Sequence, residues 1–359
     1  MIANNEKITV GIIFGGKSAE HEVSLQSAKN VYDAIDRSRF EPVLIGIDKN
    51  GVWRSTGGSL LLLNSSDPSR ISLNPDGAPV ALCPASAGRL STQAPSGQTT
   101  DSPKLDVIFP ILHGPLGEDG TVQGLLKLAG VPFVGSGVLG SAVSMDKDVM
   151  KRLFRDSGIP IGKFLAFKSH EKIPPFAEIT KALASPVFVK PANMGSSVGI
   201  SKVKNEAEFE KAVKEAFKYD VKIIIEEFIP GREIECAVLG NENPKASVPG
   251  EIIPTHEFYS YDAKYIDENG ARLEIPAKID DDCKKRVQEL AIKAFKTLCC
   301  AGLSRVDFFL KENGDVVINE INTLPGFTKI SMYPKLWEAS GIGYTELISR
   351  LIELALENA

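Results

Sequence analysis

The sequence predicts a protein of the α/β and α+β classes that is divided into three domains. Its 359 residues exceed the length that one hydrophobic core usually organises, so two or three domains are expected. Residues 8–47 read as strand, helix and strand, which is the opening of an open α/β domain. Beyond residue 145, apolar strands and amphipathic helices alternate without an internal repeat, which favours α+β domains.

The N-terminal α/β domain is expected over residues 1–144. Continuous apolar runs predict buried parallel strands, and the amphipathic runs between them predict helices. Residues 55–104 are rich in Ser, Pro, Gly and Thr, so we expect mostly a surface insertion with little regular structure there. The strands are expected at 8–14, 43–47 and 105–112, and the helices at 18–35 and 121–129.

The same patterns divide the remaining chain into a central domain, 145–232, and a C-terminal domain, 233–359. A long polar loop is expected over 254–276. The helices are expected at 145–157, 206–219 and 281–298 and from residue 344, and the strands at 164–167, 187–190, 222–226, 234–239 and 250–253.

Composition narrows the class of protein. The net charge is −5 and no dense Lys/Arg run occurs, so nucleic acid is not an expected partner. No apolar stretch approaches the roughly 20 residues that span a bilayer, so no membrane is expected either. The five cysteines show neither metal nor disulfide spacing, and no signal-peptide pattern opens the chain. Reduced thiols and a cytoplasmic location are therefore expected.

The most informative stretch is a predicted β-hairpin over residues 304–322. Two runs of β-branched, aromatic and other apolar residues flank Asn313-Gly314. Asn-Gly favours a two-residue type I′ turn, because that turn needs two residues with positive φ.

With Asn313-Gly314 as the whole loop, Asp307 lies opposite Glu320 and Arg305 lies opposite Asn322. All four side chains then share one face of the hairpin. Opposed acids destabilise a sheet, so this face predicts an oxygen-ligand site for a hard divalent cation. The alternative is a solvated polar face on which Arg305 neutralises one acid.

A glycine- and serine-rich loop joins two predicted strands over residues 187–200. Small residues allow backbone N–H groups to close on a phosphate, and Lys190 at the end of the first strand adds a positive charge. The Gly-Lys-Ser/Thr ending of a Walker A loop is missing. The alternative reading is a simple turn.

Two further segments carry acids where a ligand could meet them. The buried strand that ends at Glu226 can offer backbone groups and this carboxylate to an adenine, with Glu233 within reach of a ribose; a buried strand with a solvated tip is the alternative. Glu20 lies in the first turn of a helix and can pair with a substrate ammonium, or it can simply compensate the helix dipole.

Taken together, the motifs resemble those of the ATP-grasp superfamily, and within it those of the D-alanine–D-alanine ligases. They occur in the family's order and cover nearly the whole chain except 55–104, where the sequence resembles the longer members. The matching segments are 15–24, 113–120, 135–137 with 145–147, 190–199, 259–265, 305–307 and 320–326.

The resemblance implies a role for each of these positions. A three-domain ATP-grasp architecture is expected, with ATP and two Mg²⁺ ions, which Mn²⁺ could replace. Lys147 and Lys190 would hold the α- and β-phosphates of ATP. Glu226 and Glu233 would meet adenine and ribose, with Phe228 and Ile229 beside the base, and the metal ligands would be Asp307, Glu320 and Asn322.

The amino-acid substrates are assigned by the same resemblance. Glu20 would bind the ammonium of the first D-alanine, supported by His113, and Ser196 would help to order the loop region over Tyr265. The tyrosine at this position resembles the dipeptide-forming type. Arg305 and the Gly326 backbone would form the oxyanion site, and the second D-alanine would meet Lys264, Ser331 and Met332.

The resemblance implies ATP-dependent joining of two D-alanines through an acyl phosphate, for peptidoglycan precursor synthesis. Since water destroys an acyl phosphate, a closing lid is expected, and the 254–276 loop and the 195–199 loop are the candidates. A homodimer is expected. The alternatives are another ATP-grasp carboxylate–amine ligase with a different second substrate, and a catalytically silent nucleotide-binding protein.

Overall fold

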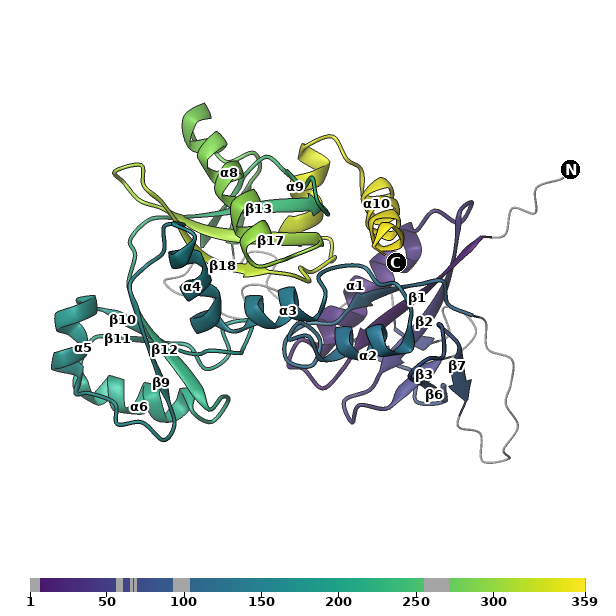
Figure 1. Ribbon diagram of the computed structural model, residues 1–359, viewed down its shortest axis with the longest axis horizontal. Coiled ribbons are helices and arrows are strands. Elements are labelled where there is room, and N and C mark those ends of the chain that lie inside the picture. Colours follow the sequence, from purple (N-terminus) through teal and green to yellow (C-terminus); the bar gives the residue numbers. More distant parts are fainter. Residues whose placement is uncertain are drawn as a thin grey trace, which may run out of the picture.

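The first sheet contains parallel strands, as the sequence predicts. The computed structural model describes residues 7–55, 61–64, 67, 70–92, 104–254 and 271–358. Strands β1 (Ile8–Gly15), β2 (Phe40–Ile47) and β8 (Val107–Ile111) run parallel, and helix α1 (His21–Ala34) joins the first two. Figure 1 shows β1 and β2 next to each other, with α1 beside them. The side chains of these strands are almost wholly buried, which explains the continuous apolar runs.

The expectation of little regular structure over 55–104 is wrong for the part that is described. Strands β3 (Trp53–Ser55), β6 (Ala78–Leu82) and β7 (Leu90–Thr92) extend the first sheet in the order β7-β6-β3-β2-β1-β8. A separate pair, β4 (Leu62–Leu63) and β5 (Ser72–Leu73), lies beside them. These strands are short and lie between turn residues. Each has too few apolar residues for a strand-type alternation to be recognised in the sequence.

Three helices lead from the first sheet toward the rest of the molecule: α2 (Thr121–Ala129), α3 (Val138–Met145) and α4 (Lys147–Asp156). The single helix expected at 145–157 is in fact preceded by another, α3. Asp146 separates them in an extended conformation, and its carboxylate accepts the N–H groups of Asp148 and Val149. This N-cap fixes Lys147 as the first residue of α4.

The second sheet is small and antiparallel. It has the order β11-β10-β12-β9, from strands β9 (Phe164–Lys168), β10 (Val187–Pro191), β11 (Ser201–Val203) and β12 (Lys222–Glu227). Helices α5 (Phe176–Leu183), which was not expected, and α6 (Glu206–Ala216) pack on it and form a separate core.

The third sheet carries the predicted hairpin. Helix α8 (Asp281–Thr297) packs against it, and α9 (Met332–Ala339), which was not expected, and α10 (Tyr344–Glu357) follow. The polar loop expected over 254–276 contains a strand at its end, and its residues 255–270 lie outside the described chain. The strands are β13 (Arg232–Gly240), β14 (Lys245–Ala246), β15 (Gly250–Pro254), β16 (Ala271–Glu274), β17 (Gly302–Leu310) and β18 (Val316–Asn322).

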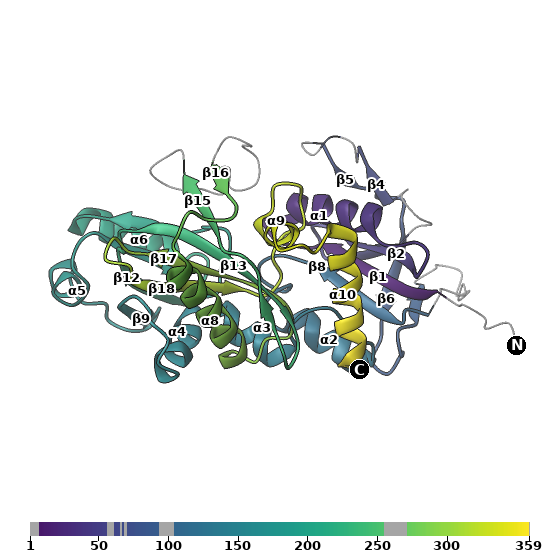
Figure 2. The same cartoon turned by 90° about the horizontal axis from the view of Figure 1, so that it is seen from above.

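The C-terminal helices connect the first and third sheets. Helix α10 contacts α1 and β8 on one side and β13 and β17 on the other (Figure 2). A single hydrophobic core therefore runs from Val10 and Phe109 to Leu303 and Leu351. In the described part of the chain, every helix is too short or too polar to cross a bilayer.

Candidate functional site

A cavity of about 350 Å³ lies between the second and third sheets and reaches the N-terminus of α1. Most of the site residues predicted from the sequence line it, and they come from the second and third sheets, from the N-termini of α1, α4 and α9, and from loops between these elements. They are Glu20, Lys147, Lys190, Ser196, Glu226, Phe228, Ile229, Glu233, Arg305, Asp307, Glu320, Asn322, Gly326, Ser331 and Met332.

The hairpin loop differs from the prediction. Lys311 N–H donates to the Asp315 carbonyl, so the loop has three residues rather than two, and of its residues only Gly314 has positive φ, at 85°. A type I′ turn would need positive φ at Asn313 as well. A β-bulge between Asp307 and Phe308 compensates for the extra loop residue.

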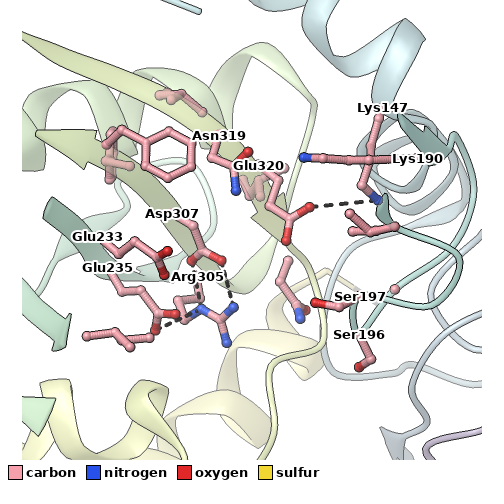
Figure 3. Close-up of a pocket in the computed structure, with 18 of the residues that line it drawn as sticks. Lys147, Lys190, Ser196, Ser197, Glu233, Glu235, Arg305, Asp307, Asn319 and Glu320 are labelled. Atoms are coloured by element: carbon pink, nitrogen blue, oxygen red, sulfur yellow. Dashed lines mark hydrogen bonds and ion pairs between the residues drawn. The ribbon is translucent and has the colours of Figure 1, made fainter. Parts of the chain in front are cut away.

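The register at the acidic face is confirmed because these two errors cancel. Asp307 pairs with Glu320 and Arg305 with Asn322. Since Phe308 pairs with Ile318, the bulge leaves Asn319 as an extra residue, and its side chain joins the cavity beside Glu320 (Figure 3).

Arg305 is the centre of a charge network on this face. Its Nε and Nη2 each lie 2.7 Å from a carboxylate oxygen of Asp307, and its Nε lies 3.0 Å from Glu235 Oε2 (Figure 3). Glu235 on β13 is opposite Asp307, so acids on three neighbouring strands form a row that ends at Glu320. The alternative reading of the sequence, Arg305 neutralising one acid, describes the contact that is seen.

The donor set nevertheless suits a hard cation. Asp307, Glu320 and the Asn322 amide supply oxygen ligands from one face of the hairpin, which is the chemistry that Mg²⁺ prefers. Within the described ranges, no three His, Cys, Asp or Glu side chains are already gathered as a metal cage. Part of the coordination would therefore come from a ligand such as a phosphate.

The end of the cavity next to α4 and the glycine- and serine-rich loop is cationic. Lys147 Nζ donates to the Met194 carbonyl at 2.7 Å and lies 3.7 Å from Glu320 Oε2. It thereby ties the glycine- and serine-rich loop to α4. In that loop Ser196 and Ser197 adopt φ values of 50° and 62°, which are strained for residues with a Cβ and are typical of ligand-binding loops.

The end of the cavity between β10 and the turn after β12 combines a largely apolar slot with a buried ionic cluster. Glu226 forms ion pairs with Lys190 and with Lys151, the latter at 2.7 Å. Burial acts to raise the pKa of Glu226, but the two lysines outweigh it and lower the pKa to about 2. The slot is lined by Phe188, Lys202, Phe228 and Ile229.

The end of the cavity nearest α1 holds two buried carboxyls, Glu20 and Glu118. A Cβ on Gly195 would lie 3.4 Å from Glu20 Oε2 and 3.9 Å from Glu118 Oε2, so both acids face the serine-rich loop. Burial raises the pKa of Glu118 to about 8, and the charge of Glu20 acts in the same direction. His113 is buried, which lowers its pKa, and its Nε2 has no hydrogen-bond partner within the described chain.

The remaining predicted residues lie at the rim or outside the described chain. A Cβ on Gly326 would come within 2.9 Å of Ser331 Oγ, so a side chain here would require Ser331 to move. Met332 begins α9 and is buried in the main core as well as lining the cavity. Lys264 and Tyr265 fall among the residues that are not described.

Sequence reasoning missed several polar residues of the site, among them Lys151, Glu235, Glu118 and Asn319. Lys151 follows Lys147 by one helical turn, so the 3.6-residue period could have found it. Glu235 lies two residues after Glu233 and so on the same face of the strand. Glu118 lies within the 113–120 motif. Asn319 had no signal, because a bulge leaves little trace in sequence.

The comparisons with known proteins agree with this geometry. Residues 9–136 match the family model "D-ala D-ala ligase N-terminus" and residues 153–353 match "D-ala D-ala ligase C-terminus". A D-alanine–D-alanine ligase of Oceanobacillus iheyensis is 57% identical over 352 residues, covering 98% of this chain and 96% of that protein.

Solved structures show the same fold. The D-alanine–D-alanine ligase of Coxiella burnetii has a TM-score of 0.84 at 38% identity and covers 98% of this chain and 96% of its own. The VanG D-Ala:D-Ser ligase of Enterococcus faecalis has a TM-score of 0.84 at 37% identity, with 98% and 100% covered. The fold is thus the ATP-grasp fold of these ligases, and the chain belongs to the D-alanine–D-alanine ligase family.

Proposed function

We propose that this protein joins two D-alanines to D-alanyl-D-alanine with ATP, in the cytoplasm, as a step of peptidoglycan precursor synthesis. The proposal depends on one observation. A single cavity is lined by two lysines that could bind phosphates, by the acidic face of the hairpin, and by a buried carboxylate that could bind an ammonium group. The family relatives at 57% identity are named for this reaction.

The phosphates would lie between Lys147 and Lys190. A carboxylate is a poor electrophile, and transfer of the γ-phosphoryl group from ATP to the first D-alanine turns it into an acyl phosphate. The fixed cations would stabilise the negative charge that is spread over the moving phosphoryl group. Glu226, Phe228, Ile229 and Glu233 would orient the adenosine part.

Asp307, Glu320 and Asn322 would hold two Mg²⁺ ions, or Mn²⁺ in their place. Bound there, the ions would neutralise phosphate charge beside the lysines. The ion pairs of Asp307 with Arg305 and of Glu320 with Lys147 show that these carboxylates are balanced by cations before any metal binds.

Glu20 would bind the ammonium of the first D-alanine, with the buried His113 behind it. The amine of the second D-alanine then attacks the acyl phosphate, and phosphate leaves. Arg305, held in place by Asp307 and Glu235, and the Gly326 N–H would donate to the tetrahedral oxyanion. Lys264 and Ser331 would lie near the carboxylate of the second substrate, with Met332 beside it.

Two loops would keep water from the acyl phosphate. Ser196 would help to order the region around Tyr265, and both the 195–199 and 254–276 loops are candidates for the lid. We also propose a homodimer, and domains at 1–144, 145–232 and 233–359. Helix α10 crosses these boundaries, because it contacts α1 and β8 as well as β13 and β17.

The test is phosphate release from ATP with D-alanine, with L-alanine, and with D-alanine plus D-lactate. We expect release only with D-alanine present and dipeptide as the main product. Release without dipeptide would contradict the proposal.

A second candidate differs only in the second substrate. The match to a D-Ala:D-Ser ligase at the same TM-score is the observation that favours it. Competition between D-serine and D-alanine, with both products separated by chromatography, decides between the two.

A further inference from the structure

One buried carboxylate, Glu226, is shared by two buried lysines. Lys151 Nζ lies 2.7 Å from its Oε1, and Lys190 Nζ contacts its Oε2. The side chains of Lys151 and Glu226 are 4% and 9% exposed, and that of Lys190 is 12% exposed. The cluster therefore carries one positive charge in excess, away from water.

The two lysines come from different elements and have different access to the cavity. Lys151 projects from α4, one turn after Lys147, and is almost wholly enclosed. Lys190 projects from β10, diagonally across from Glu226 on β12, and points into the cavity beside Glu320 (Figure 3). Lys190, the more exposed of the two, is therefore the lysine placed to turn toward a phosphate.

When Lys190 turns to the phosphates, Glu226 keeps a counter-ion only because Lys151 remains. A buried carboxylate that loses every cation takes up a proton, since burial favours its neutral form. A protonated carboxyl can donate a hydrogen bond, whereas an ionised one can only accept. The charge state of Glu226 thus decides which chemical group it can recognise in the base slot.

We propose that Lys151 is a positioning residue that holds Glu226 as an ionised acceptor and thereby selects purines with an amino group at C6. This proposal rests on the proposed function, in which Glu226 faces the adenine. The 6-amino group of adenine donates to an ionised carboxylate, whereas the 6-oxo group of hypoxanthine is an acceptor and is repelled by it. Lys190 is the exchangeable partner and Lys151 the permanent one.

The test compares binding of ATP and inosine triphosphate to the full-length protein without D-alanine, by titration calorimetry. The wild type should prefer ATP. Lys151→Met should weaken ATP binding by about tenfold or more, which is the range for a lost charge-assisted hydrogen bond, and should change the affinity for inosine triphosphate much less. The ATP preference should therefore fall by about tenfold.

Three variants serve as controls. Lys151→Gln removes the charge but keeps a donor toward Glu226, so it replaces Lys151→Met if that variant does not fold, and it should also lose ATP preference. Lys151→Arg keeps the charge and should retain the preference. Lys222→Met breaks a partly buried ion pair outside the cavity, in which Lys222 Nζ lies 2.6 Å from an Asp146 carboxylate oxygen, and should lower stability without changing the preference.

An unchanged ATP preference in the folded neutral variants, or no preference in the wild type, overturns the inference. Retention of the preference in Lys222→Met together with its loss in both neutral Lys151 variants supports it. A wild type that binds ATP and makes no dipeptide would instead overturn the proposed function alone.

Discussion

Glu118 is a buried carboxyl that binds its proton more tightly in the folded protein than in the unfolded chain. Its Oε2 accepts the Gly114 N–H at 2.6 Å, and Glu20, Lys147 and Glu320 are the charged groups around it. Its pKa rises from 4.5 to about 8, mainly through burial. This group therefore stabilises the fold fully below pH 4.5, and that contribution is lost as the pH rises through about 8.

Glu118→Gln should reverse that loss, because the amide has nearly the same shape and never ionises. We expect the free energy of unfolding of the variant, relative to the wild type, to rise between pH 5 and pH 9. Urea denaturation without ligands at several pH values measures it. Glu210→Gln, at an exposed position on α6, is the matched control, and a difference that stays flat with pH in Glu118→Gln would contradict the account.

Glu320 sits at the end of the row of acids across β13, β17 and β18. Glu320→Ala should abolish turnover and remove any additional thermal stabilisation that Mg²⁺ gives to the ATP-bound protein. The variant should still fold, because like charges on neighbouring strands destabilise a sheet and one of them is gone. Thermal melts with ATP, with and without Mg²⁺, check this, and normal turnover would refute the metal assignment.

Element by element, the hairpin shows how far sequence patterns reach. The alternation along residues 304–310 and 316–322 predicted the acidic face, because side chains must alternate along a strand. The loop length and the bulge at Asn319 were not predictable, since each depends on local backbone geometry and they offset one another. The break between α3 and α4 was not predictable either. It depends on the single Asp146 side chain that caps α4, and a periodic pattern does not reveal such a cap.

The conformation of the three-residue loop predicts that a substitution at Gly314 lowers stability. Its φ of 85° is unfavourable for any residue with a Cβ, and nothing lies within 4 Å of a Cβ built there, so the cost is purely conformational. Gly314→Ala should lower the free energy of unfolding by about 1–2 kcal/mol. Gly124→Ala, in the open interior of α2, should instead raise it by about 0.5–1 kcal/mol. Equal effects of both changes would rule out the left-handed turn.

At the scale of the whole molecule, the fold class and the gathering of distant motifs were predictable, but the packing between domains was not. The proposed boundaries at 144 and 232 give no sign that α9 and α10 contribute to the core that the first sheet shares with the third. Apolar residues on a C-terminal helix indicate that one face of the helix is buried, but they do not indicate which element packs against it. Only the structure shows that the first and third sheets share one core, while the second sheet keeps its own.

The shared core predicts that the first and third sheets unfold together. Leu351 on α10 is fully buried in it, and Leu351→Ala should lower the free energy of unfolding by about 2–5 kcal/mol. The two tryptophans are fluorescent reporters of different parts of the molecule. Trp53 lies on β3 of the first sheet, which pairs with β2, and Trp337 lies on α9 in the shared core. In Trp53→Phe and Trp337→Phe backgrounds, urea midpoints followed by fluorescence should coincide, and Leu351→Ala should shift both to the same extent.

Ile179→Ala, in the separate core of the second sheet, should shift neither midpoint, because that core can open while the shared core stays intact. Separate midpoints for the two tryptophans, or a shift of Trp337 alone, would mean that α10 stabilises only the third sheet.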